Sequence, residues 1–107
     1  MRYTGSFWIK VPIPHYSIAN SMPKNIKMET IHELVPPWDL VVAYKRKDIN
    51  DDEYSAIYTE QLEELGIDAI LGLIPDNTVV CCWEKTGFCH RHVLAEYLGE
   101  RIMREIA

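Results

Sequence analysis

Ten residues near the end of the chain bring together several kinds of chemically reactive side chain. The segment 82–91 holds two thiols, a carboxylate, an amine, an imidazole and a guanidinium, which belong to Cys82, Glu84, Lys85, Cys89, His90 and Arg91. Thiols, carboxylates and imidazoles serve as nucleophiles and as general acids or bases, and a guanidinium binds anions. We therefore expect the functional site of the protein to lie at this segment.

A buried strand and a helix should hold this segment in place. Residues 78–82 form a run of β-branched and small apolar side chains, which is typical of a strand buried on both faces. A final helix is predicted over 89–106. Before the strand, the apolar spacing predicts a helix over 51–65, ended by Gly66, and a short helix over 68–73. Helix, strand, loop and helix in this order indicate an α/β fold, in which ligands bind beyond the carboxyl ends of the strands.

The first half of the chain carries weaker signals. Strands are predicted over 1–9 and 15–19, because β-branched and aromatic residues gather there. The segment 38–47 has strand propensity but also helical spacing, and we favour a helix because Pro37 suits a first turn and basic residues suit the last. The whole chain, 1–107, is thus expected to form one small α/β domain with a mostly parallel sheet flanked by helices.

Two basic residues, His90 and Arg91, occupy the first turn of the predicted final helix, where positive charge is unfavourable. Cations at a helix N-terminus cost about 0.3–1 kcal/mol, and such local conflicts tend to mark functional sites. In one explanation, Arg91 pairs with Glu84 or another acid and holds the loop against the helix. In the other, Arg91 and the free backbone N–H groups bind an anion such as a phosphate or carboxylate. The sequence leaves both open, and Glu84 could orient Arg91 or act as a general acid or base.

The three cysteines have different surroundings in the sequence. Cys81 should point into the core, whereas Cys82 at the strand end could face the site. Cys89 at a helix start is either a reactive thiol or a buried inert one. The odd count and the adjacent pair argue against a disulfide framework. Cys82, Cys89 and His90 are possible zinc ligands, but their spacing matches no zinc motif, so neither a metal nor a cofactor is expected.

Composition narrows the choice of partners. The net charge of −5 argues against broad nucleic-acid binding, which needs a basic face. No apolar run approaches the about 18 residues of a membrane span, and no secretion signal is evident, so we predict a cytoplasmic protein. A protein partner is the alternative to a small ligand, with Phe7, Trp8 and Trp38 as candidate contact residues.

The segment 79–98, VVCCWEKTGFCHRHVLAEYL, resembles family 488 of the domains of unknown function (DUF488), in its short form. The family pattern is a buried strand ending in Cys, an acid two residues later, and Cys-His-Arg opening a helix. The likeness extends upstream through a Ser-Ile-Ala segment at Ser17, although Asn20 stands where a basic residue is expected, which implies a less cationic pocket. The resemblance implies an α/β fold and a site, but no reaction.

The leading hypothesis is a site that binds an anionic small molecule or a nucleotide-like group. Its alternatives are a thiol-dependent enzyme that uses Cys89, and a protein-interaction module in which the motif is structural. The candidate catalytic residues are Cys89, His90 and Glu84, and the candidate ligand-binding residues are Arg91, Cys82 and Ser17.

Overall fold

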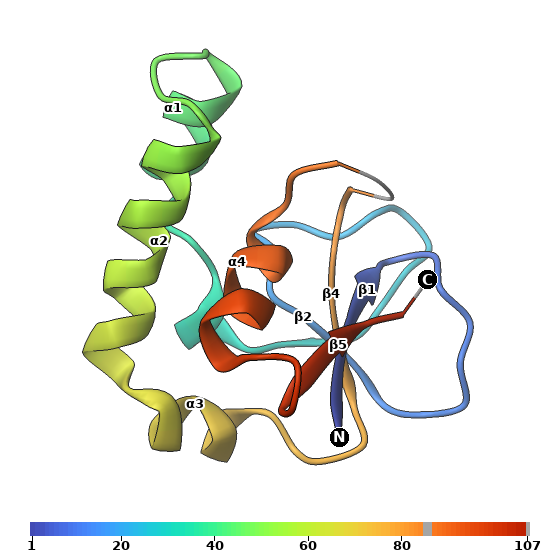
Figure 1. Ribbon diagram of the computed structural model, residues 1–107. Helices are drawn as coiled ribbons and strands as arrows, with labels where there is room; N and C mark the ends of the chain where they lie inside the picture. The colour runs from blue at the N-terminus through green and yellow to red at the C-terminus, as the bar shows by residue number, and fades with distance from the viewer. Residues whose placement is uncertain (85–86, 107) are drawn as a thin grey trace.

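A computed structural model describes residues 1–84 and 87–106, and its centre is a five-stranded sheet. The strands are β1 (Arg2–Ser6), β2 (His15–Ser17), β3 (Glu29–Thr30), β4 (Val79–Cys82) and β5 (Met103–Glu105). They lie in the order β3-β2-β4-β1-β5, and every neighbouring pair is parallel. Figure 1 labels β1, β2, β4 and β5 where they run beside one another. The expected α/β fold with a parallel sheet is confirmed. The carboxyl ends of all strands consequently lie along one edge of the sheet.

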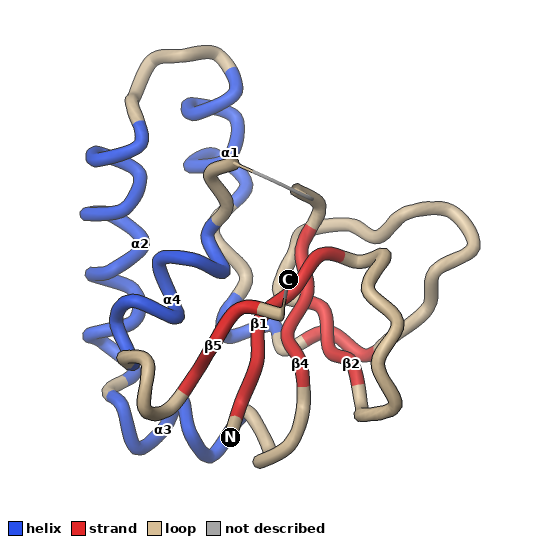
Figure 2. The backbone as a smooth tube through the Cα atoms, turned by 45° about the vertical axis from the view of Figure 1, so that its right-hand side comes forward, coloured by secondary structure: helices blue, strands red, loops and turns tan. Residues whose placement is uncertain are grey.

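The helices gather on one face of this sheet, as Figure 2 shows. They are α1 (Trp38–Lys45), α2 (Asp51–Leu65), α3 (Ile67–Leu73) and α4 (His90–Leu98), preceded by a 3-10 turn at His32–Leu34. Tyr58, Leu62 and Leu94 pack there against Val80 of the central strand. Loops cover the opposite face, where the buried residues include Phe7, Val79, Ala19 and Cys81. Among the described residues, no helix is both long and apolar enough to cross a membrane.

Local signals fix the long helix α2 within the bounds that the sequence predicts. The Asn50 side chain accepts a hydrogen bond from the Glu53 backbone N–H at 2.9 Å, and the Glu53 carboxylate accepts one from the Asn50 N–H at 3.1 Å. This reciprocal capping satisfies two backbone donors at the helix start. Gly66, with a φ of 84°, ends the helix. The ambiguous segment 38–47 also forms a helix, α1, as favoured.

Replacing Asn50 with alanine should destabilise the fold by about 1 kcal/mol, because a cap acceptor is lost and a helix-start N–H is left to water. Urea unfolding of Asn50→Ala, followed by circular dichroism, measures the change in the free energy of unfolding. Glu63→Ala, on the exposed side of the same helix, is the control and should stay within about 0.5 kcal/mol of the wild type. Equal stability of both variants would contradict the role of the cap.

The prediction of one final helix over 89–106 is wrong. Helix α4 ends at Leu98, and Gly99 adopts a φ of 92°, a conformation that favours glycine and stops a helix. The chain then reverses, and β5 pairs in parallel with β1, with Arg2 opposite Met103 and Thr4 opposite Glu105. The segment forms a strand because β1 would otherwise be an open edge of the sheet. β5 covers that edge and hydrogen-bonds the backbone groups of β1.

Candidate functional site

A cavity of about 380 Å³ opens beyond the carboxyl ends of β2 and β4. Its walls come from α1, α2, the loop after β2 and the loop between β4 and α4. The aromatic part of the wall consists of Trp38, Tyr44, Tyr54, Trp83 and Phe88. The polar part consists of Asn20, Ser21, Lys45, Glu84, Cys82, Cys89 and His90. The cavity therefore brings most of the predicted motif together with aromatic residues from the preceding helices.

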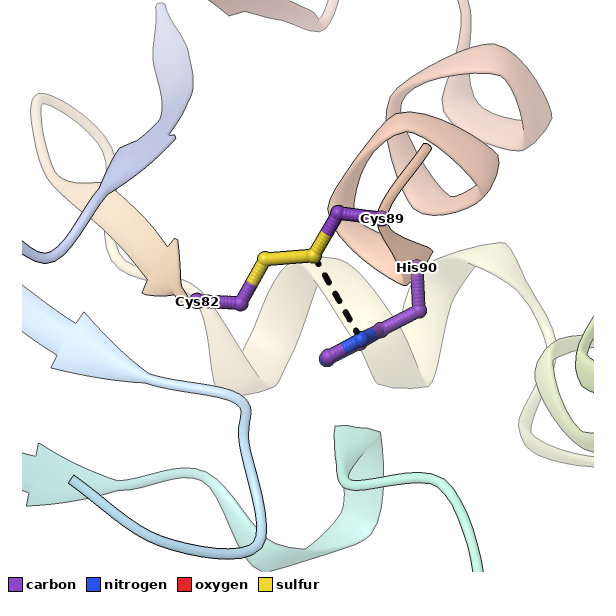
Figure 3. A group of neighbouring side chains, drawn as sticks. All are labelled: Cys82, Cys89 and His90. Carbon is purple, nitrogen blue, oxygen red and sulfur yellow. Dashed lines mark hydrogen bonds between the residues drawn. A yellow bond between two sulfur atoms is a disulfide. The ribbon is translucent and has the colours of Figure 1, made fainter. Parts of the chain in front are cut away.

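The two predicted site cysteines meet in this cavity. Cys82 ends β4 and Cys89 directly precedes α4, and their Sγ atoms are bonded to each other (Figure 3). Their Cα atoms are 7.3 Å apart. The argument against a disulfide framework is thus corrected for this pair, whose approach the sequence leaves open. The argument against one concerned the neighbours Cys81 and Cys82, whereas the bond joins a strand end to a helix start that the fold brings together.

Arg91 is completely buried beside this pair. Its Nε donates to both carboxylate oxygens of Glu105, at 3.1 and 3.2 Å, and its Nη2 donates to one of them at 3.0 Å. Its Nη1 donates to the Glu84 carbonyl at 2.6 Å and to the Cys82 Sγ at 3.0 Å. This placement fits the explanation in which an acid pairs with the arginine, and that acid is Glu105 rather than Glu84. Arg91 is not among the residues that line the cavity.

Glu105 is held ionised by its partners. Burial raises the pKa of its carboxyl, but hydrogen bonds from Arg91 and Thr4 outweigh that effect and leave the pKa below its ordinary value. Thr4 on β1 donates its hydroxyl to the carboxylate at 2.5 Å. The carboxylate is therefore tied both to the sheet and to α4. Sequence reasoning missed this residue because it assigned position 105 to a helix.

His90 lies beneath the cysteine pair with its two ring nitrogens in different roles. Nε2 lies 2.5 Å from the Ile18 carbonyl oxygen and must carry the proton, since a carbonyl only accepts. Burial lowers the pKa of His90 to about 4, so its ring is neutral at neutral pH. Nδ1 is consequently an acceptor, and it lies 3.7 Å from the Cys89 Sγ (Figure 3).

The two sulfur atoms thus differ in their neighbours. Cys82 faces a charged N–H donor of Arg91, whereas Cys89 faces the acceptor nitrogen of His90. A thiolate is stabilised by a charged donor, and a protonated thiol donates to an acceptor. Once the bond is reduced, this arrangement favours a Cys82 thiolate and a protonated Cys89 thiol.

The remaining predicted residues take different places. The Glu84 side chain is exposed at the cavity wall. Ser17 is buried, and its hydroxyl accepts a hydrogen bond from the Ala19 N–H at 3.1 Å, outside the cavity lining. Lys85 lies outside the described residues. Of the aromatic residues considered for a protein partner, Phe7 is buried, while Trp8 and Trp38 are exposed.

Helices α1 and α2 contribute residues that sequence reasoning did not assign to the site. Tyr44 and Tyr54 stack edge to face, with ring centroids 5.2 Å apart, and both contact Phe88. The Tyr44 hydroxyl donates to Asp51 at 2.5 Å, and this bond, with burial, raises the Tyr44 pKa to about 12. The Lys45 ammonium lies 5.8 Å from the centre of the Trp38 ring. On the sequence these residues form part of ordinary helical patterns, which carry no signal for a cavity.

Comparison with known proteins yields a match at the level of a family. The family model DUF488-N3a, described as the active DUF488-N3 subclade, matches residues 8–102. No curated protein and no solved structure matches the chain significantly. The match spans most of the chain and includes the strand, the loop and the helix that carry the cysteine pair. The chain therefore belongs to the DUF488 family.

Proposed function

We propose that the protein is a thiol-dependent oxidoreductase that acts on a small molecule through Cys82 and Cys89. The observation that carries this proposal is the bonded cysteine pair in a ligand-sized cavity, with a buried guanidinium 3.0 Å from one of its sulfur atoms. A structural cross-link needs neither the cavity nor the charged donor. The description of the matching subclade as active agrees with a catalytic role.

In the proposed reaction, the reduced pair donates two electrons. The substrate is a disulfide: the Cys82 thiolate attacks one of its sulfur atoms, the S–S bond of the substrate breaks, a mixed disulfide with Cys82 forms and the first thiolate leaves. The Cys89 sulfur, which is hydrogen-bonded to His90 Nδ1, then attacks Cys82, and the Cys89 proton passes to the second thiolate as that group leaves. The Cys82–Cys89 bond forms, the second thiolate leaves, and an external dithiol restores the reduced pair.

The cavity wall supports a substrate with a flat ring and an acidic group. Cavities of about 300–1,000 Å³ hold small molecules, and this one has the volume for a compact ligand. Aromatic walls favour stacking of a planar ring. Lys45 is the cation in the described part of the wall, so it, rather than the buried Arg91, is proposed to bind the anionic group. A nucleotide-like group belongs to this class.

Reaction with dithiobis(nitrobenzoate), a disulfide of two flat rings that each carry a carboxylate, tests the proposal. Reduced protein in EDTA should release two equivalents of the coloured thiolate and end with its own disulfide. Cys89→Ser should release one equivalent and retain a mixed disulfide, because nothing resolves it. Cys82→Ser should react at least about tenfold more slowly, because the stabilised thiolate is gone.

Two controls separate site chemistry from simple access to a thiol. Cys81→Ala should behave as the wild type, since Cys81 is buried and unbonded. Lys45→Gln should slow the reaction with the acidic probe but not with hydroxyethyl disulfide, which has neither ring nor charge. Equal rates for wild type, Cys82→Ser and Cys89→Ser would refute the assigned roles.

A further inference from the structure

Three potential metal ligands converge on one point of the cavity. The Cys82 Sγ, the Cys89 Sγ and a ring nitrogen of His90 all lie within 4.8 Å of one another, and all three residues are buried. Figure 3 shows the sulfur atoms and the imidazole directed toward each other from the end of β4 and the start of α4. Buried thiols and an imidazole are the ligands that zinc prefers.

We propose that the reduced protein binds one thiophilic divalent cation, of the zinc type, through Cys82, Cys89 and His90, with a fourth coordination position open to the cavity. This inference uses the reduced pair of the proposed function but does not require that the pair turns over. The disulfide and the metal site are alternative states of the same two sulfur atoms, because a bonded sulfur is not a thiolate ligand.

The distances agree with such a site. Tetrahedral zinc places a sulfur and a nitrogen ligand about 3.6 Å apart, and two sulfur ligands about 3.8 Å apart. The Cys89 Sγ and the His90 Nδ1 are 3.7 Å apart. The Cα atoms of the two cysteines are 7.3 Å apart, which leaves room for the reduced sulfur atoms to separate around an ion.

The groups around the three ligands also suit a metal. Ligating imidazoles usually donate their other N–H to a carbonyl or carboxylate, and His90 donates its Nε2–H to the Ile18 carbonyl at 2.5 Å. Arg91 has a similar role toward the other side of the site, because its Nη1 donates a hydrogen bond to the Sγ of the proposed ligand Cys82. The two thiolates balance the charge of the ion, and each thiol that is protonated beforehand releases its proton on binding.

The fourth position would face the cavity, since all three ligating residues line it. Structural zinc sites are closed by four protein ligands, whereas catalytic sites keep one position for water or substrate. The chemical class of ligand expected there is a water molecule or an electron-pair donor atom of a small molecule with a flat ring.

Titration of metal-free protein with Co²⁺ under anaerobic conditions tests this site. Reduced wild type should bind one equivalent and develop a thiolate-to-cobalt charge-transfer band with the intense visible bands of tetrahedral cobalt. Zn²⁺ should displace the colour. The oxidised wild type has the same sequence but its two sulfur atoms are bonded to each other, so it should show neither the charge-transfer band nor the visible cobalt bands.

Substitutions then assign the ligands. Cys89→Ser and His90→Gln should weaken Zn²⁺ binding by at least about 100-fold in competition with a zinc chromophore. The matched controls, Cys81→Ala and His92→Gln, should retain the affinity of the wild type. Absence of the cobalt bands in reduced wild type would overturn the inference, as would equal cobalt spectra in the reduced and oxidised forms. Neither result would affect the thiol reaction in EDTA, so the two proposals fail separately.

Discussion

Glu105→Gln should lower the free energy of unfolding by about 3 kcal/mol at neutral pH. The substitution keeps the size of the side chain but removes the only carboxylate hydrogen-bonded to Arg91 within the described residues. Arg91 has no exposed surface, so its charge would remain buried without a counter-ion. Removing one partner of a buried pair costs about 3–5 kcal/mol, and the partial exposure of the Glu105 side chain, 35%, places the loss at the lower end.

The pH dependence of this loss has a definite sign. The pKa of Glu105 in the folded protein lies below its ordinary value of 4.5. The ionised carboxylate therefore stabilises the fold above pH 4.5, and this contribution disappears as the pH falls through the folded-state pKa. Wild type and Glu105→Gln should differ most at neutral pH and converge in acid.

Urea unfolding at several pH values measures both effects. Glu96→Gln, on the exposed surface of α4, is the control and should stay within about 0.5 kcal/mol of the wild type at every pH. A difference between wild type and Glu105→Gln that is small at neutral pH, or that grows in acid, would contradict the role assigned to the carboxylate.

Local signals explain which parts of the fold the sequence predicted well. The helix over 51–65 has a cap at Asn50 and a glycine at position 66, and both lie next to the residues that they control. The signal for the buried strand that ends at Cys82 is also local, because it consists of consecutive apolar residues within the strand itself. The motif from Cys82 to Arg91 was located for the same reason.

Contacts between distant segments explain the failures. Ile102 and Ile106 continue the helical spacing of α4, so the sequence pattern favours a longer helix. The structure forms a strand instead, because Gly99 ends the helix with a positive φ and β1 offers an edge for pairing. Arg91 was recognised as a misplaced cation at a helix start, but its partner Glu105 comes from that strand. A local pattern does not reveal such a pairing.

The cavity was hidden for a related reason. Tyr54 belongs to an apolar stripe of α2, and the sequence alone does not show that one end of the stripe lines a cavity rather than the core. The cysteine pair likewise depends on how the end of β4 meets the start of α4. The sequence therefore places the candidate site residues in one segment, while the fold determines which of them touch.

Alkylation of the reduced protein with iodoacetamide should be strongly selective among its cysteines. The Cys82 thiolate is stabilised by Arg91, so its reaction should have a pH midpoint below the about 8.5 of an ordinary thiol. Burial raises the pKa of Cys81 to about 12, so almost none of it is thiolate at neutral pH and it should react far more slowly than an ordinary thiol. Mass spectrometry of peptides after timed alkylation, in EDTA, distinguishes the cysteines.

Glu105→Gln gives this experiment its sharpest test, because stability and reactivity should move in opposite directions. The carboxylate offsets part of the positive charge that Arg91 presents to the Cys82 Sγ, and its removal strengthens the field at that sulfur. The variant should therefore be less stable than the wild type and yet show a lower pH midpoint for alkylation of Cys82. A purely structural ion pair would lower stability without moving the midpoint. An upward shift would mean that the guanidinium does not act on the thiolate and that Arg91 serves the fold alone.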